Sequence, residues 1–120
     1  MSVSKDKYYS WDYSEKSDIL NVHKVDKKTA GSAELGDFTV DFDKNGNIVG
    51  VEILNASEFF TLLGILKTQL GNIKEAEIIM RKRGEMTLIC LKLLLSGEEA
   101  PRIVSLPASV MNEAPITATA

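Results

Sequence analysis

Two alternating apolar stretches on either side of an Asn-Gly pair constrain the fold of this chain more than any other feature. Residues 37–42 read DFTVDF and residues 48–53 read IVGVEI, with apolar side chains at every second position. Asn45-Gly46 between them is typical of a two-residue type I′ turn. That turn brings three apolar pairs together on one side of the ribbon: Phe42 with Val49, Val40 with Val51, and Phe38 with Ile53. The sequence therefore predicts an antiparallel β-hairpin with one buried face.

Another hairpin is predicted before this one. Residues 8–13 and 19–25 are rich in aromatic and β-branched side chains, and residues 14–18 between them are turn formers. In the polar loop 26–36 we expect a short pairing segment near residues 32–35. The first half of the chain therefore contains about four antiparallel strands.

A single helix is predicted near residues 56–70. Asn55 is a good N-cap, Glu58 follows at the capping-box spacing, and Gly71 suits the position after the last turn. Gly64 inside the helix indicates close packing against the sheet or a tolerated flaw. The apolar face expected to pack on the sheet comprises Phe59, Leu62, Leu63, Leu66 and Leu70.

About three more strands are predicted after the helix, at residues 73–81, 86–95 and 102–107. A rival interpretation makes residues 73–83 a helix, because Glu, Ala, Lys and Arg favour one. Apolar and acidic residues alternate there, however, which favours a strand. Antiparallel strands with one covering helix give an α+β fold. We expect one domain over residues 1–107 and a loosely held tail over residues 108–120.

Composition and charge limit the class of protein. The chain has 120 residues and a formal net charge of −3, which suits one globular domain and argues against a nucleic-acid binder. Its single cysteine, Cys90, permits no intramolecular disulfide and fits a reducing compartment. The first residues lack the apolar core of a signal peptide, and the apolar stretch 88–95 is far shorter than the ~20 residues of a membrane span. We expect a cytoplasmic protein without membrane contact.

Residues 41–52, DFDKNGNIVGVE, fit the calcium-loop pattern of an EF-hand. An EF-hand needs a helix on each side, whereas residues 31–40 contain two glycines and alternate like a strand. Val49, at the ninth loop position, offers no oxygen ligand. We interpret the pattern as the exposed acidic face of the hairpin and predict no metal site. The alternative is a weak cation site on Asp41, Asp43, Asn45 and Glu52.

No catalytic constellation is recognisable in the sequence. His23 has no nucleophile or metal ligand near it at a known spacing and is expected to point outward from its strand. Cys90 lies in an apolar stretch and is expected to be a small buried hydrophobe. The sequence favours a non-enzyme without a cofactor. An enzyme or metal-dependent binder that uses the carboxylates of Asp41, Asp43 and Glu52 is the alternative.

The basic run Arg81–Arg83 is the one stretch that suggests phosphate contact. Three basic residues beside Gly84 are more typical of a solvated hairpin tip, and Glu85 follows directly. A nucleic-acid binder through Arg81–Arg83 therefore remains a second alternative.

Residues 13–60 resemble the family known as domain of unknown function 2283. The resemblance rests on YSEKSDILNVHKV at 13–25 and GDFTVDFDKNGNIVGVEILNASEFF at 36–60. Ser14 departs from the family's usual Asp, and Asn21 departs from its usual Tyr, which puts a stacking role at position 21 in doubt. The matching positions are Tyr13, Asp18, Leu20, Val22, Asp41, Asp43, Gly46, Gly50, Glu52, Ile53, Leu54 and Ser57.

The resemblance implies a small module of β-hairpins and a helix found in short prokaryotic proteins. It carries no established activity, cofactor or catalytic residue, and some relatives look like partners of small toxin-like proteins. A small sheet with one covering helix also leaves strand edges that invite pairing. We therefore expect a non-enzymatic module that binds a protein, with a homodimer through a strand edge or the second sheet face as the simplest form.

Overall fold

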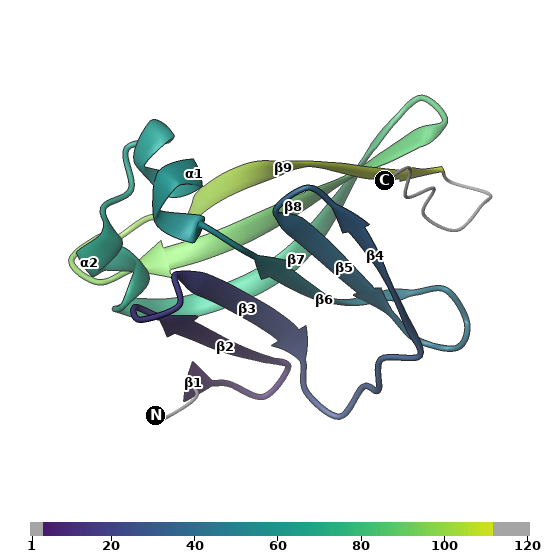
Figure 1. Ribbon diagram of the computed structural model, residues 1–120, viewed down its shortest axis with the longest axis horizontal. Helices are drawn as coiled ribbons and strands as arrows, with labels where there is room; N and C mark the ends of the chain where they lie inside the picture. Colours follow the sequence, from purple (N-terminus) through teal and green to yellow (C-terminus); the bar gives the residue numbers. More distant parts are fainter. Residues whose placement is uncertain (1–3, 112–120) are drawn as a thin grey trace.

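The structure, a computed structural model, describes residues 4–111 and contains two antiparallel sheets and two short helices (Figure 1). One sheet has six strands in the order β1-β2-β3-β6-β5-β4, and the other has three in the order β7-β8-β9. The bounds are β1 Ser4–Lys5, β2 Tyr9–Ser14, β3 Ile19–Lys24, β4 Gly31–Leu35, β5 Phe38–Phe42, β6 Ile48–Ile53, α1 Ala56–Leu62, α2 Lys67–Leu70, β7 Ile73–Arg83, β8 Met86–Leu95 and β9 Arg102–Met111.

The hydrophobic core joins the two sheets. Most strands alternate apolar and polar side chains, and their apolar faces meet in one buried cluster that also takes residues from both helices. Two hydrogen bonds fix β2 on β7: the Trp11 indole Nε1 donates to the Ile73 carbonyl at 3.0 Å, and the Tyr9 hydroxyl donates to the Ile78 carbonyl at 3.2 Å. Figure 1 shows both helices at one end of the molecule and the tip of the β7–β8 hairpin at the other.

The predicted α+β class holds in outline, because the fold is mostly antiparallel sheet with a small helical part. Over residues 4–111 there are nine strands rather than the predicted seven or so. β1 was not predicted, since its two polar residues show no alternation. β4 is the pairing segment expected near residues 32–35, and it lies beside β5.

The predicted strands after the helix are present. β7 confirms the strand interpretation of residues 73–83 over the rival helix, and it pairs with β8 along its length. β9 passes the predicted end at residue 107, because its pairing with β8 continues as far as Met86 and Met111. Residues 112–120 of the predicted tail lie outside the described residues.

The β5–β6 hairpin has the predicted pairing over most of its length, including Val40 with Val51, but its turn was predicted wrongly. Residues 44–46 form a three-residue loop, and Gly46 takes the left-handed conformation with a φ of +82°. Phe42 consequently pairs with Ile48 instead of Val49. A register shift next to this pair restores the predicted match for the rest of the hairpin.

The single helix predicted near residues 56–70 was wrong, because α1 and α2 are separate. α1 ends in a Schellman motif, in which Gly64 has a φ of +77° and the Ile65 N–H donates to the Phe60 carbonyl at 2.9 Å. This break leaves Ile65 fully buried. A Cβ on Gly64 would meet only the Arg102 side chain at 3.9 Å, so its backbone conformation, and not close packing, explains this glycine.

The break also changes which side chains are buried. Leu62, Leu63 and Leu66, which were predicted to face the sheet, are 86%, 45% and 61% exposed. Asn55 precedes α1 as predicted but makes no side-chain cap, and Gly71 directly follows α2 with a right-handed φ of −75°. Over residues 4–111, both helices are too short to cross a bilayer.

Candidate functional site

The acidic hairpin does not have the geometry of an EF-hand, because strands β5 and β6 flank it instead of helices. The Asp43 carboxylate accepts hydrogen bonds from the backbone N–H groups of Asn45 at 2.9 Å and Asn47 at 3.0 Å. The bond from Asn47, helped by the bond from Asn45, lowers the pKa of Asp43. This carboxylate therefore holds its own turn, with Asn45 as a residue of that turn.

Asp41 and Glu52 lie on the outward face of the six-stranded sheet, away from the core. The Asp41 carboxylate accepts a hydrogen bond from the Ser32 hydroxyl at 2.5 Å, and Glu52 lies on the next strand beside Thr39. Within the part of the chain that the structure describes, no three His, Cys, Asp or Glu side chains gather closely enough to hold a metal ion. The structure thus does not bring Asp41, Asp43 and Glu52 together, and the weak cation site remains a prediction.

His23 lies on the same outward face, and hydrogen bonds engage both of its ring nitrogens. Nδ1 lies 2.8 Å from the Lys24 carbonyl oxygen, and Nε2 lies 3.0 Å from the Thr29 hydroxyl. A carbonyl can only accept, so Nδ1 donates to it, and Nε2 shares a hydrogen bond with the Thr29 hydroxyl. Gly50 lies beside the ring, where a Cβ would come within 2.5 Å of it. These contacts hold the imidazole in one position against the sheet.

Asp18 forms a polar network that sequence reasoning missed. Its carboxylate accepts hydrogen bonds from the Tyr13 hydroxyl at 2.6 Å, the Ser57 N–H at 3.0 Å and the Ser57 hydroxyl at 2.7 Å. Burial raises the pKa of Asp18, but these hydrogen bonds outweigh it and the pKa lies below its usual value. Asp18 thus caps α1 from the β2–β3 turn in place of Asn55. The family pattern includes Tyr13, Asp18 and Ser57, and it was the sequence signal that could have identified this network.

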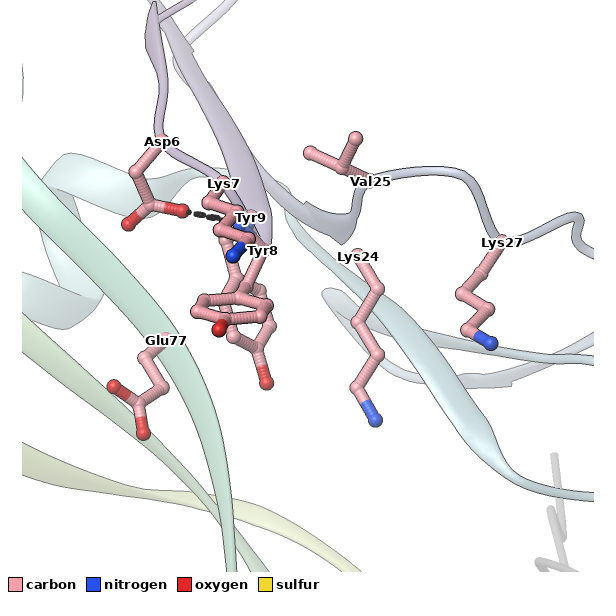
Figure 2. Close-up of a pocket in the computed structure, with 8 residues that line it drawn as sticks. All are labelled: Asp6, Lys7, Tyr8, Tyr9, Lys24, Val25, Lys27 and Glu77. Atoms are coloured by element: carbon pink, nitrogen blue, oxygen red, sulfur yellow. Dashed lines mark hydrogen bonds between the residues drawn. The ribbon is translucent and has the colours of Figure 1, made fainter.

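A groove of about 520 Å³ lies between the β1–β2 turn, the end of β3 and β7 (Figure 2). Asp6 shapes this turn, since its carboxylate accepts from the backbone N–H groups of Tyr8 and Tyr9, each at 2.8 Å. The groove mixes lysines with acids, and its lining includes no Ser, Thr, Cys or His. It is lined by Asp6, Lys7, Tyr8, Tyr9, Lys24, Val25, Lys27 and Glu77.

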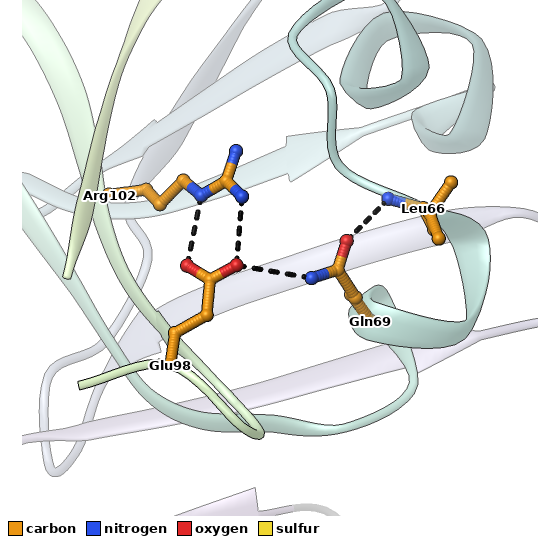
Figure 3. A network of polar contacts seen from close by, with 4 residues as sticks. All are labelled: Leu66, Gln69, Glu98 and Arg102. Carbon is orange, nitrogen blue, oxygen red and sulfur yellow. Dashed lines mark hydrogen bonds and ion pairs between the residues drawn. The ribbon is translucent and has the colours of Figure 1, made fainter. Parts of the chain in front are cut away.

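Another polar network ties α2 to the β8–β9 loop (Figure 3). The Arg102 guanidinium donates to the Glu98 carboxylate at 3.0 and 2.8 Å, and the Gln69 Nε2 donates to the same carboxylate at 3.2 Å. The Gln69 Oε1 accepts from the Leu66 N–H at 2.8 Å. The hydrogen bonds from Arg102 lower the pKa of Glu98. These groups bind one another and hold the helix in place.

The three-stranded sheet has aliphatic side chains that lie outside the hydrophobic core. Its inner face packs on the six-stranded sheet, and its other face, which we call the outer face, combines aliphatic and charged side chains. Within residues 4–111, none of the outer-face side chains belongs to the core cluster. The outer face comprises Glu75, Glu77, Ile79, Arg81 and Arg83 of β7, Met86, Leu88, Cys90, Lys92 and Leu94 of β8, and Ile103 and Ser105 of β9.

β8 runs through the middle of the outer face and is apolar on both sides. Its inner residues, such as Leu91 and Leu93, are fully buried, as expected for a core strand. On the outer side Leu88 and Leu94 are only half-buried, and Ile103 on β9, which pairs with Lys92, is 45% exposed. Cys90 is buried as predicted, with its Sγ 3.6 Å from the Ser105 hydroxyl oxygen. Arg81 and Arg83 lie on the same face at the hairpin end of β7, and all of Arg81–Arg83 is exposed.

Comparison with known proteins supports the resemblance noted in the sequence. The uncharacterised protein MJ0789 of Methanocaldococcus jannaschii is 45% identical over 51 residues, which are 42% of this chain and 44% of that protein. This chain therefore spans less than half the length of that relative. No solved structure matches the chain. The family model described as protein of unknown function (DUF2283) matches residues 11–57, from β2 to the start of α1. This match confirms the predicted resemblance and leaves the three-stranded sheet outside it.

Proposed function

We propose that this protein is a non-enzymatic binding module that self-associates through the outer face of the three-stranded sheet. The observation that carries the proposal is the two-sided apolar character of β8, MTLICLKLLL. Strands that are apolar on both faces are typical of sheets covered on both sides, whereas antiparallel sheets with one wet face alternate. The core covers only the inner side of β8.

The size of the outer face sets the strength expected of the contact. Three strands at about 4.8 Å spacing and about nine residues at 3.3 Å give a face of roughly 14 by 30 Å, or about 400 Å² per copy in projection. This is at the low end for a specific protein interface. We therefore expect a weak dimer that forms at micromolar concentration or above.

Sedimentation velocity from about 1 to about 500 μM tests self-association. Ile79 is half-buried on the outer face, and Ile79→Lys should weaken the dimer on the order of tenfold or more, because it places a charge at the centre of the contact. Ile19→Lys is the matched control, since Ile19 is also half-buried on an outward sheet face and lies on β3. A wild-type protein that stays monomeric over the whole range would refute the proposal.

A further inference from the structure

The charges on the outer face follow an order along β7. The outward positions of this strand read Glu75, Glu77, Ile79, Arg81 and Arg83, so that two acids and two arginines lie on either side of an isoleucine. Glu77 and Arg81 are four residues apart, or about 13 Å along the strand. This exceeds the Debye length of about 8 Å at physiological salt, so the two ends act as separate acidic and basic poles.

The acidic pole includes side chains from other elements. A hollow of about 230 Å³ at this end has Asp6, Glu75, Glu77 and Glu99 in its lining, together with one cation, Lys92. Lys92 lies opposite Glu77 in the sheet register, but the structure records no ion pair between them.

The basic pole lies at the hairpin end of β7. Arg81 and Arg83 are exposed, and the ion pair recorded in the described region joins Arg102 and Glu98 instead. Glu85 lies beyond them at the tip of the hairpin.

We propose that a second copy of the chain covers the outer face with its strands antiparallel, so that Glu77 of each copy faces Arg81 of the other and Glu75 faces Arg83. This arrangement rests on the self-association proposed above and specifies its geometry. A two-fold axis that lies in the contact plane, perpendicular to the strands at the level of Ile79, produces these pairs.

The alternative two-fold axis, parallel to the strands, is unfavourable. It would place the acidic pole of one copy over the acidic pole of the other and the basic pole over the basic pole. Like charges that face each other across an interface weaken the association. Opposite charges favour it and determine how the two surfaces align. In the antiparallel arrangement the arginines of one copy enter the acidic hollow of the other, and the aliphatic residues of both copies meet at the centre.

Charge reversal tests the arrangement by sedimentation velocity. Glu77→Arg alone and Arg81→Glu alone should each weaken the dimer on the order of tenfold, because each change turns two symmetry-related attractions into repulsions. The double variant should recover wild-type affinity, because it restores opposite charges at both contacts. The Glu75 and Arg83 positions provide a second, independent swap. Glu34→Arg on the exposed part of β4 is the control for a change in net charge.

The outcomes separate this inference from the proposed function. If the wild type is a monomer at every concentration, both are wrong. If it dimerises but both single reversals leave the dissociation constant unchanged, or neither double variant recovers it, the antiparallel arrangement is wrong and self-association stands. Circular dichroism of every variant must show the wild-type fold before its affinity is interpreted, and the second swap replaces the first if a variant fails that criterion.

Discussion

Replacing Asp18 with alanine should destabilise the protein by about 3 kcal/mol, because its carboxylate is the cap of α1 and also binds Tyr13. Loss of an N-cap costs about 1 kcal/mol, and loss of hydrogen bonds to a partly exposed charged group adds about 1 kcal/mol more. Asp18 also has a φ of +58°, where alanine is less favourable than aspartate by about 1 kcal/mol. Because the free energy of unfolding falls by about 2 kcal/mol for each molar of urea, the urea concentration at the unfolding midpoint should fall by about 1.5 M.

Asp26 offers a matched control for the backbone contribution. It has a φ of +62°, is exposed, and its carboxylate makes no hydrogen bond recorded for residues 4–111. Asp26→Ala should therefore cost only the backbone share, about 1 kcal/mol. The difference between the two variants, about 2 kcal/mol, measures the network of Asp18 with Tyr13 and Ser57. Equal urea midpoints for Asp18→Ala and Asp26→Ala would refute the assignment of Asp18 as the cap.

The same carboxylate predicts a pH dependence. Because the pKa of Asp18 is lower in the folded protein than in the unfolded chain, its contribution is complete above the unfolded pKa of about 3.9 and is lost as the pH falls through the folded pKa. The stability difference between the wild type and Asp18→Asn should shrink between about pH 5 and pH 2 in urea titrations, and a constant difference would contradict the lowered pKa. Gly50→Ala should destabilise by about 1–2 kcal/mol, since its Cβ would come within 2.5 Å of the hydrogen-bonded His23 ring and 2.9 Å of the Asp41 carboxylate. Adding His23→Ala should recover much of that loss; if it does not, the close approach is not the cause.

Local pattern predicted the strands well, because alternation reports directly which face of a strand is buried. The β5–β6 pairing and the strand interpretation of residues 73–83 both follow from that rule. The same rule failed at the Asn45-Gly46 turn. A three-residue loop with a bulge and a two-residue turn place the same apolar pairs together farther along the hairpin, so the pattern cannot distinguish them.

The candidate sites were less predictable than the strands. The calcium pattern at residues 41–52 supplies suitable residue types, but Asp43 folds back on its own turn while Asp41 binds Ser32. The outer face depends on an order of charges that is visible only once β7 is known to be a strand with Ile79 on its uncovered side. The Asp18 network joins residues 39 positions apart, which local spacing cannot reveal.

The sequence by itself determined the type of fold and the resemblance to the DUF2283 family over residues 11–57, because alternation, turn residues and a shared pattern are properties of short segments. Only the tertiary structure decided where the helix breaks, since the buried position of Ile65 depends on the sheets beneath it and Gly64 permits the required turn. It also decided which apolar residues remain uncovered. Leu88 and Leu91 are alike in the sequence, and their different exposure arises because the six-stranded sheet packs on one side of β8.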